Sequence, residues 1–319
     1  MAKSTDIKYL VNVRDGDRWT IYTDALTKGK GIKEAKALLS SGNFDGVKVT
    51  EDRGQSREKI VFEEESAGRT ERPVSVTPVE EAPYCKELED FYSFDARITM
   101  GRLMREHLDH VGITAGELIH DKMNILAVVR NDNFYIQILQ TLANLQTKDS
   151  DEKPADRIDF LEATVKQMTD RAQFADDLSE FEEVLDNAHA GELIKEVTAK
   201  IAEGNQAFSI RAVLSRYLSR KGDWEGKLDL LLDQIEKEPG EVALIYIDEM
   251  LGEIFDGSEA VQEILGYQRN LAAAMTTLVQ LAAGSYEISE GSNSPMERLS
   301  AVMAKYDLKQ TQDILLDRV

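Results

Sequence analysis

The chain has almost none of the cysteines on which small disulfide-stabilised or zinc-bound folds depend. Cys85 is the single cysteine among 319 residues. One thiol cannot form an internal disulfide, and it cannot supply the spaced cysteines of a zinc site. We therefore expect Cys85 to be an incidental thiol in a protein of a reducing compartment.

Proline and glycine are scarce as well, with six and 20 residues respectively. Three of the prolines, Pro73, Pro78 and Pro83, fall within eleven residues, among Ser, Thr, Val and Glu. This composition favours extended, solvated chain, so we interpret residues 66–84 as a linker. The scarcity of helix breakers elsewhere favours helix.

No apolar run is long enough to span a bilayer. The first ten residues, MAKSTDIKYL, show no apolar segment behind their positive charges, as a secretory signal would. The longest nearly uninterrupted apolar stretch, residues 271–283, is interrupted by Thr276, Thr277 and Gln280 and falls short of the ~20 residues that a transmembrane helix needs. We expect a cytoplasmic protein with no membrane partner.

Negative charge outnumbers positive charge over most of the chain. Residues 1–70 hold 13 Lys and Arg against 12 Asp and Glu, and the remaining residues hold 25 against 47, a net charge of −22. Such a surface repels phosphate backbones. We therefore expect residues 85–319 not to bind nucleic acid, and only residues 1–65 remain as a candidate for that role.

Apolar residues are densest between residues 242 and 284, which we take as the organising part of the chain. In its first half they recur with the spacing of a helix of 3.6 residues per turn, at Ala243, Ile247, Met250, Leu251 and Ile254. Residues 244–246 leave no clearly polar side in the first turns. A helix that is apolar on all sides is usually buried, so we predict that other helices pack around it.

The N-terminal residues alternate between apolar and polar in the manner of short strands. Residues 9–13 and 19–23 both alternate, and Asp15-Gly16-Asp17 between them favours a turn, so we predict a hairpin. A short helix over residues 32–39 is expected to follow.

Two further strands are predicted at residues 47–49 and 59–64. The last of them should place Ile60 and Phe62 on one face. Two strands, a helix and two strands form a small α+β (ββαββ) module at residues 1–65.

The sequence after the linker has helical periodicity. Thr114 and Glu117, three residues apart, form a capping box, which predicts a helix from there to about Val129. Asn131 or Asp132 can cap the next helix. Further helices are expected at 155–171, 175–189, 191–203, 206–220, 223–237, 241–256, 258–267, 270–283, 294–305 and 309–318.

The fold class that follows is mostly α, with the small module preceding an acidic all-helical domain at residues 85–319. The polar residues 147–155 are a candidate subdomain boundary. Short turns between helices favour a multi-helix bundle or an irregular solenoid-like stack. No residue pattern repeats at a fixed period, which argues against a true repeat family.

Three of the four histidines, His107, His110 and His120, lie close together in sequence and have acidic neighbours, so they are weak candidates for a metal site. On a helix, His107 falls within roughly 20° of Met100, in the middle of an apolar stripe. His120 lies off the apolar stripe of its own helix. Because two helices would have to present opposite faces to one ion, we expect no metal and no cofactor.

The carboxylates of the central helix, Asp248, Glu249 and Glu253, could belong to a di-metal site only with a Glu-x-x-His pattern from facing helices. No histidine follows His189. We interpret these acids as part of a solvated helix face.

One glycine-rich helix entrance is a candidate anion site. It follows a strand, opens a helix and offers unpaired N–H groups beside lysines, with the candidate residues Lys28, Gly29, Lys30, Gly31 and Lys33. A dinucleotide loop would have a third glycine where this chain has Glu34. Residues 222–228 also resemble a P-loop, but they are one residue short and lack the Ser or Thr that holds magnesium.

We expect a non-enzymatic adaptor or regulatory scaffold that binds other proteins through its helical surface. The alternative is a sensor of an anion, nucleotide or nucleic acid through residues 1–65. An enzyme with dispersed residues ranks third, since no local motif assembles a Ser/His/Asp or Cys/His arrangement. A homo-oligomer is compatible with all three.

Overall fold

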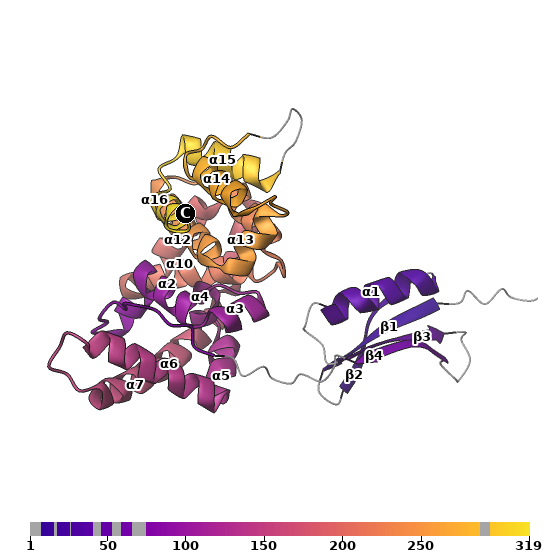
Figure 1. Ribbon diagram of the computed structural model, residues 1–319, viewed down its shortest axis with the longest axis horizontal. Helices are drawn as coiled ribbons and strands as arrows, with labels where there is room; N and C mark the ends of the chain where they lie inside the picture. Colours follow the sequence, from indigo (N-terminus) through magenta and orange to yellow (C-terminus); the bar gives the residue numbers. More distant parts are fainter. Residues whose placement is uncertain are drawn as a thin grey trace, which may run out of the picture. The chain divides into compact units, whose positions relative to one another are not determined.

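The structure is a computed structural model that describes residues 8–15, 18–25, 27–40, 46–52, 59–65, 75–287 and 294–319. The chain divides into two compact units, residues 1–74 and residues 75–319. The described residues form one four-stranded antiparallel sheet and 16 α-helices, which confirms the predicted fold class (Figure 1). No described helix is both long and apolar enough to cross a membrane.

The first unit is the predicted ββαββ module. Its elements are β1 (Lys8–Asp15), β2 (Arg18–Ala25), α1 (Lys28–Ser40), β3 (Gly46–Asp52) and β4 (Lys59–Glu65). The strands lie in the order β2-β1-β3-β4, each antiparallel to its neighbour. Alternate residues of the two central strands face α1 and form the core with it: Val11, Val13, Ala35, Val47 and Val49.

The prediction that Ile60 and Phe62 share a face is wrong. The register of β3 and β4 shifts by one residue, so that Val49 pairs with Phe62 and Thr50 pairs with Ile60. Paired residues point to the same side of a sheet, and consecutive residues of β3 point to opposite sides. Phe62 therefore packs against the core beneath α1, whereas Ile60 is half exposed.

The second unit consists of helices joined mainly by short turns. In Figure 1 it extends from α5–α7 at one end, through α2–α4 and α10–α13, to α14–α16 at the other. The helices are α2 (Phe94–Leu103), α3 (Arg105–Val111), α4 (Ala115–Ile119), α5 (Lys122–Arg130), α6 (Asp132–Thr147), α7 (Pro154–Phe174), α8 (Ser179–Asn187), α9 (Ala190–Lys200), α10 (Glu203–Leu218), α11 (Trp224–Glu236), α12 (Glu241–Asp256), α13 (Ser258–Leu265), α14 (Leu271–Ala282), α15 (Pro295–Lys305) and α16 (Lys309–Asp317), with 3-10 turns η1 (Leu88–Tyr92) and η2 (Ala175–Leu178).

Helix α12 is the centre of this unit, as its apolar stripe predicted. All five stripe residues from Ala243 to Ile254 are buried. The helix packs against α2, α11, α13 and α16. Helices from the middle of the unit and from its α14–α16 end therefore pack against it.

The helix expected from Thr114 to Val129 is two helices. Thr114 and Glu117 form the predicted capping box at the start of α4. The helix ends at His120, and the Asp121 side chain accepts a hydrogen bond from Asn124 N (2.8 Å), which caps α5. A second N-cap so close to the first breaks the helix and lets α4 and α5 point in different directions.

The described part of the expected linker, residues 75–84, runs along the helical unit. Thr77 N donates to the carbonyl of Leu103 at the end of α2 (3.0 Å), and Gln146 of α6 donates to the carbonyl of Pro83 (2.5 Å). These contacts tie the segment to two helices. Residues 66–74 lie outside the described residues.

Candidate functional site

A buried ion pair joins α4 to α11. The Lys227 Nζ lies 2.6 and 2.7 Å from the two carboxylate oxygens of Glu117, and the two side chains are 1% and 0% exposed. Lys227 also donates to the carbonyl of Gly112 (2.7 Å), and the Ser219 hydroxyl donates to Glu117 (2.9 Å). Every charged oxygen and nitrogen of this pair therefore has partners, as a charge removed from water requires.

A second cluster joins α2, α10 and α12. Arg97 Nε lies 2.7 Å from Glu253 and its Nη2 lies 2.8 Å from Glu249. Arg211 of α10 binds the same oxygen of Glu249 at 3.1 Å. The second oxygen of Glu253 accepts from the backbone N–H of Gly116 (2.6 Å). Because Gly116 directly precedes Glu117, this hydrogen bond brings the second cluster next to the first pair, and we call the two together the polar layer.

The interpretation of the α12 acids as a solvated face is therefore wrong. Glu249 and Glu253 bind arginines in the interior. Asp248 accepts from Gln310 N (2.9 Å), Thr311 N (2.9 Å) and the Thr311 hydroxyl (2.7 Å), so it caps α16 from another helix. The missed signal was their position in a helix whose apolar residues leave little polar surface, where acids are buried unless one side faces solvent.

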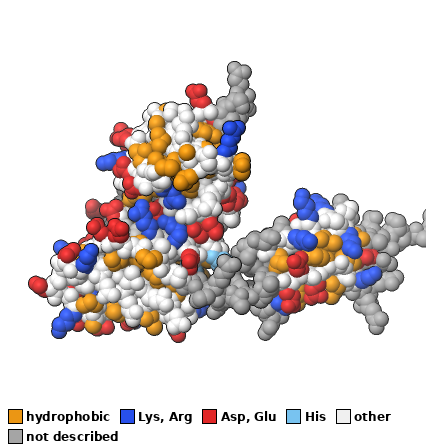
Figure 2. All heavy atoms as spheres, viewed as in Figure 1, with side chains coloured by type: hydrophobic (Ala, Val, Ile, Leu, Met, Phe, Trp, Pro, Cys, Tyr) orange, Lys and Arg blue, Asp and Glu red, His pale blue; other side chains and the backbone are white. Residues whose placement is uncertain are grey.

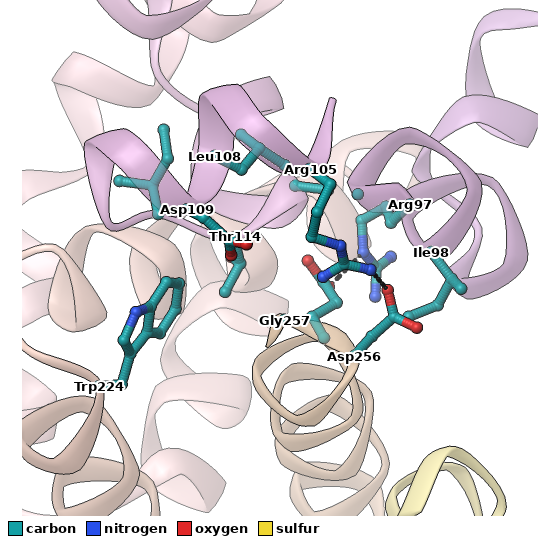
Figure 3. Close-up of a pocket in the computed structure, with 13 residues that line it drawn as sticks. Arg97, Ile98, Arg105, Leu108, Asp109, Thr114, Trp224, Asp256 and Gly257 are labelled. Atoms are coloured by element: carbon teal, nitrogen blue, oxygen red, sulfur yellow. Dashed lines mark hydrogen bonds and ion pairs between the residues drawn. The ribbon is translucent and has the colours of Figure 1, made fainter. Parts of the chain in front are cut away.

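A charged cavity opens beside this layer, where α2, α3 and α12 meet (Figure 3). Arg105 extends from α3 to form an ion pair with Asp256 at the end of α12, and Arg102 binds the other oxygen of Asp256 at 2.9 Å. Burial raises the pKa of Asp109 on the cavity wall. The volume is about 20 Å³, space for about one water molecule. The cavity is too small for an organic substrate.

A larger cavity lies among α2 and α4–α7, with one wall completed by η1. Its volume is about 80 Å³. Most of its lining side chains are buried Leu, Ile, Val, Phe and Met, and the two that carry a polar atom are Thr164 and Tyr135. Such a cavity can hold an apolar group but offers little chemistry.

The three histidines do not converge. His120 is fully buried against the rings of Tyr92 and Phe208, and its Nδ1 lies 2.7 Å from the carbonyl of Gly116. Burial lowers its pKa to about 3. His107 packs against Phe134, with ring centroids 5.6 Å apart, and His110 is exposed. The described residues contain no group of three or more His, Cys, Asp or Glu placed to hold a metal ion.

The candidate anion residues lie in the first two turns of α1. Lys28, Gly29, Lys30 and Lys33 are exposed. Gly31 is buried, and a Cβ there would lie 3.2 Å from Val49. This glycine therefore allows α1 to approach the sheet closely, which accounts for its presence without a ligand.

The second glycine-rich turn, at residues 222–228, has its N–H groups occupied. The Asp223 carboxylate accepts from Gly226 N (2.6 Å), and Glu263 of α13 accepts from Trp224 N (2.8 Å) and Glu225 N (3.1 Å). Protein carboxylates thus take the place that a phosphate would have at this helix N-terminus.

The outward side of α14 presents large apolar side chains to solvent. Its Leu271 and Val279 are 75% and 41% exposed, and Tyr267 just before it is 91% exposed. Figure 2 shows hydrophobic side chains gathered over this part of the unit.

The chain matches no family model, and neither the curated proteins nor the solved structures that were compared with it contain a significant match.

Proposed function

We propose that the protein is a non-enzymatic adaptor whose helical unit binds another protein through the outward side of α14. We call this surface the α14 face and define it by Tyr267, Leu271, Met275 and Val279. The last three recur every four residues and so lie along one side of the helix.

The observation that carries the proposal is the absence of charge from α14. It is the one α-helix among those the structure describes that has no Asp, Glu, Lys or Arg, in a chain in which 30% of residues are charged. Centres of protein interfaces are depleted of charge and enriched in aromatic residues and Met. Large exposed apolar side chains that cluster on a soluble surface mark interaction sites.

The interior supports binding better than catalysis. An active site needs converging polar groups in a cavity that admits a substrate. Here the charged cavity has the volume of a water molecule, and the buried carboxylates Glu253 and Asp256 that line it are engaged by arginines, namely Arg97, Arg102 and Arg105. These pairs join helices that are distant in sequence, as expected of interactions that stabilise the fold.

The net charge of the helical unit around the α14 face indicates the charge that the partner's surface should carry. Residues 71–319 carry a net charge of −22. A partner with an apolar centre and a rim of Lys and Arg would be complementary to an uncharged face on such a surface, and the rim would speed association at low salt. Binding should therefore weaken as the salt concentration rises.

The test compares two double variants in affinity capture from an extract of the source cells. Leu271→Glu/Val279→Glu places two charges on the α14 face. Met123→Glu/Ile136→Glu places two on similarly exposed apolar residues of α5 and α6, which are 61% and 49% exposed. Exposed substitutions of this kind change stability by about 0.5 kcal/mol or less, so both variants should fold.

We expect the same partner to be captured by the wild-type chain and by the Met123 variant, and to be lost from the α14 variant. Equal capture by all three chains would contradict the proposal. Light scattering separates a further outcome: a wild-type dimer that the α14 substitutions convert to a monomer would assign the face to a second copy of this chain.

A further inference from the structure

The cavity among α2 and α4–α7 is larger than the voids that protein interiors normally leave. Interiors are packed as densely as organic crystals, and their few voids are mostly smaller than a water molecule. This one has a volume of about 80 Å³, four times that of the charged cavity beside Asp256. It lies in the helices at the α5–α7 end of the unit in Figure 1, and none of its lining residues belongs to the α14 face.

Water is a poor occupant of this cavity. A buried water molecule needs two to four hydrogen-bond partners, and empty cavities lined by Leu, Ile and Phe stay dry. The polar atoms on the lining side chains are the hydroxyls of Thr164 and Tyr135. The Thr164 hydroxyl already donates to the carbonyl of Phe160 in its own helix (2.9 Å). The space is therefore suited to an apolar occupant.

The size and the walls indicate a small occupant. An engineered apolar cavity of about 150 Å³ binds benzene, and this cavity has about half that volume. Three of the lining residues are methionines: Met100, Met104 and Met168. Unbranched methionine side chains adopt alternative rotamers at little cost and adapt to the shape of a ligand. A short or branched hydrocarbon of a few carbon atoms fits this space.

The absence of charge from the lining indicates a neutral occupant. None of the side chains around the cavity is Lys, Arg, Asp or Glu. A carboxylate or an ammonium group inside it would lose its hydration without gaining an ionic partner, which is costly. Amino acids, nucleotides and carboxylate anions are therefore excluded as ligands of this space.

Tyr135 lies at the edge of the cavity. Its side chain lines the cavity and is partly exposed. Burial and the nearby Glu162 carboxylate raise the pKa of its phenol, so the hydroxyl keeps its proton at neutral pH. At this partly exposed edge the hydroxyl of a neutral alcohol can keep its contact with water while the hydrocarbon part fills the cavity.

We propose that this cavity is a binding site for a small uncharged aliphatic molecule, of which propan-1-ol is the model ligand. The inference is independent of the α14 face, because the two sites share no residue and each can fail without the other.

The experiment uses the full-length protein with ¹³C-labelled methionine methyl groups. Two probes share one carbon skeleton and differ in charge: propan-1-ol and propanoate. Xenon serves as a third, purely apolar probe. The exposed Met123 lies outside the cavity lining and reports non-specific effects within the same spectrum.

We expect saturable shifts of the Met100, Met104 and Met168 methyl signals with the alcohol and with xenon, and an affinity for the carboxylate weaker by at least about tenfold. Filling the cavity with Val128→Leu/Val165→Leu should weaken alcohol binding by a similar factor. Equal binding of the alcohol and the carboxylate, or alcohol binding unchanged in a folded double variant, would overturn the inference. If that variant does not fold, the wild-type protein provides the test. The absence of any shift of the three methyl signals with xenon or alcohol would refute the inference.

Discussion

Filling the apolar cavity should stabilise the helical unit. Val128 lines the cavity from α5 and is buried. Replacing it with Leu adds one methylene group to a space that no side chain occupies. The same replacement at Val213, which is fully buried on α10 and lines neither cavity, adds the group to packed core. The two variants differ in location alone, so they isolate the effect of the void.

The magnitude follows from the volume. At about 24 cal/mol per Å³, a void of 80 Å³ costs about 2 kcal/mol, which is the upper limit for any filling substitution. One buried methylene contributes ~0.8 kcal/mol, so Val128→Leu should raise the free energy of unfolding by up to that amount. Val213→Leu should lower it by about 1–3 kcal/mol through overpacking.

Urea denaturation followed by circular dichroism at 222 nm measures both changes, because this signal comes mainly from the second unit. An increase in the midpoint at constant slope indicates added stability without a change in the surface exposed on unfolding. If Val128→Leu destabilises the protein as much as Val213→Leu does, the cavity is closed in solution and the reasoning fails.

Further substitutions test the interior. Lys227→Met should cost about 3–5 kcal/mol because it leaves the Glu117 carboxylate buried without its cation, and adding Glu117→Gln should restore part of the loss in the same urea assay. The folded-state pKa of His120 is lowered from 6.5 to about 3. The stability that depends on a neutral His120 is therefore complete above pH 6.5 and is lost as the pH falls towards 3, by up to ~5 kcal/mol. Between pH 7 and pH 4 the melting temperature should decline less steeply in His120→Phe than in the wild-type protein. Trp224→Ala and Ile247→Ala should each cost about 2–5 kcal/mol as large-to-small core changes, and unchanged melting temperatures would place these side chains at the surface.

Much of the fold could be predicted from the sequence because its elements are locally specified. The stripe in α12 and the caps at Thr114, Asn131 and Asp223 each lie within one or two turns of the residues they control. The predicted range 241–256 coincides with α12. Predictions of the fold failed where a single residue changes the result. The one-residue register shift between β3 and β4, for example, places Ile60 on the exposed side of the sheet.

The interior site could not be predicted because its partners are far apart in sequence. Arg97 and Glu253 are 156 positions apart, and Glu117 and Lys227 are 110 apart. No spacing rule joins residues over such distances, and each acid taken alone resembles an exposed one. The apolar cavity could not be predicted from the sequence either, because it is a space between side chains, each of which has the pattern of an ordinary core residue.

The ion pairs and the cavity are connected through α2 and α4. Arg97 of α2 and Glu117 of α4 are held by carboxylate and ammonium groups of α12 and α11, while Leu103 and Leu118 of the same two helices line the cavity. A void normally shrinks because the surrounding elements move into it, and its cost depends on how far they can move. Moving α2 or α4 towards α5–α7 would stretch buried ion pairs, and breaking one costs about as much as the void or more. The polar layer thus fixes two walls of the cavity, which is why the space persists in a core that could otherwise collapse.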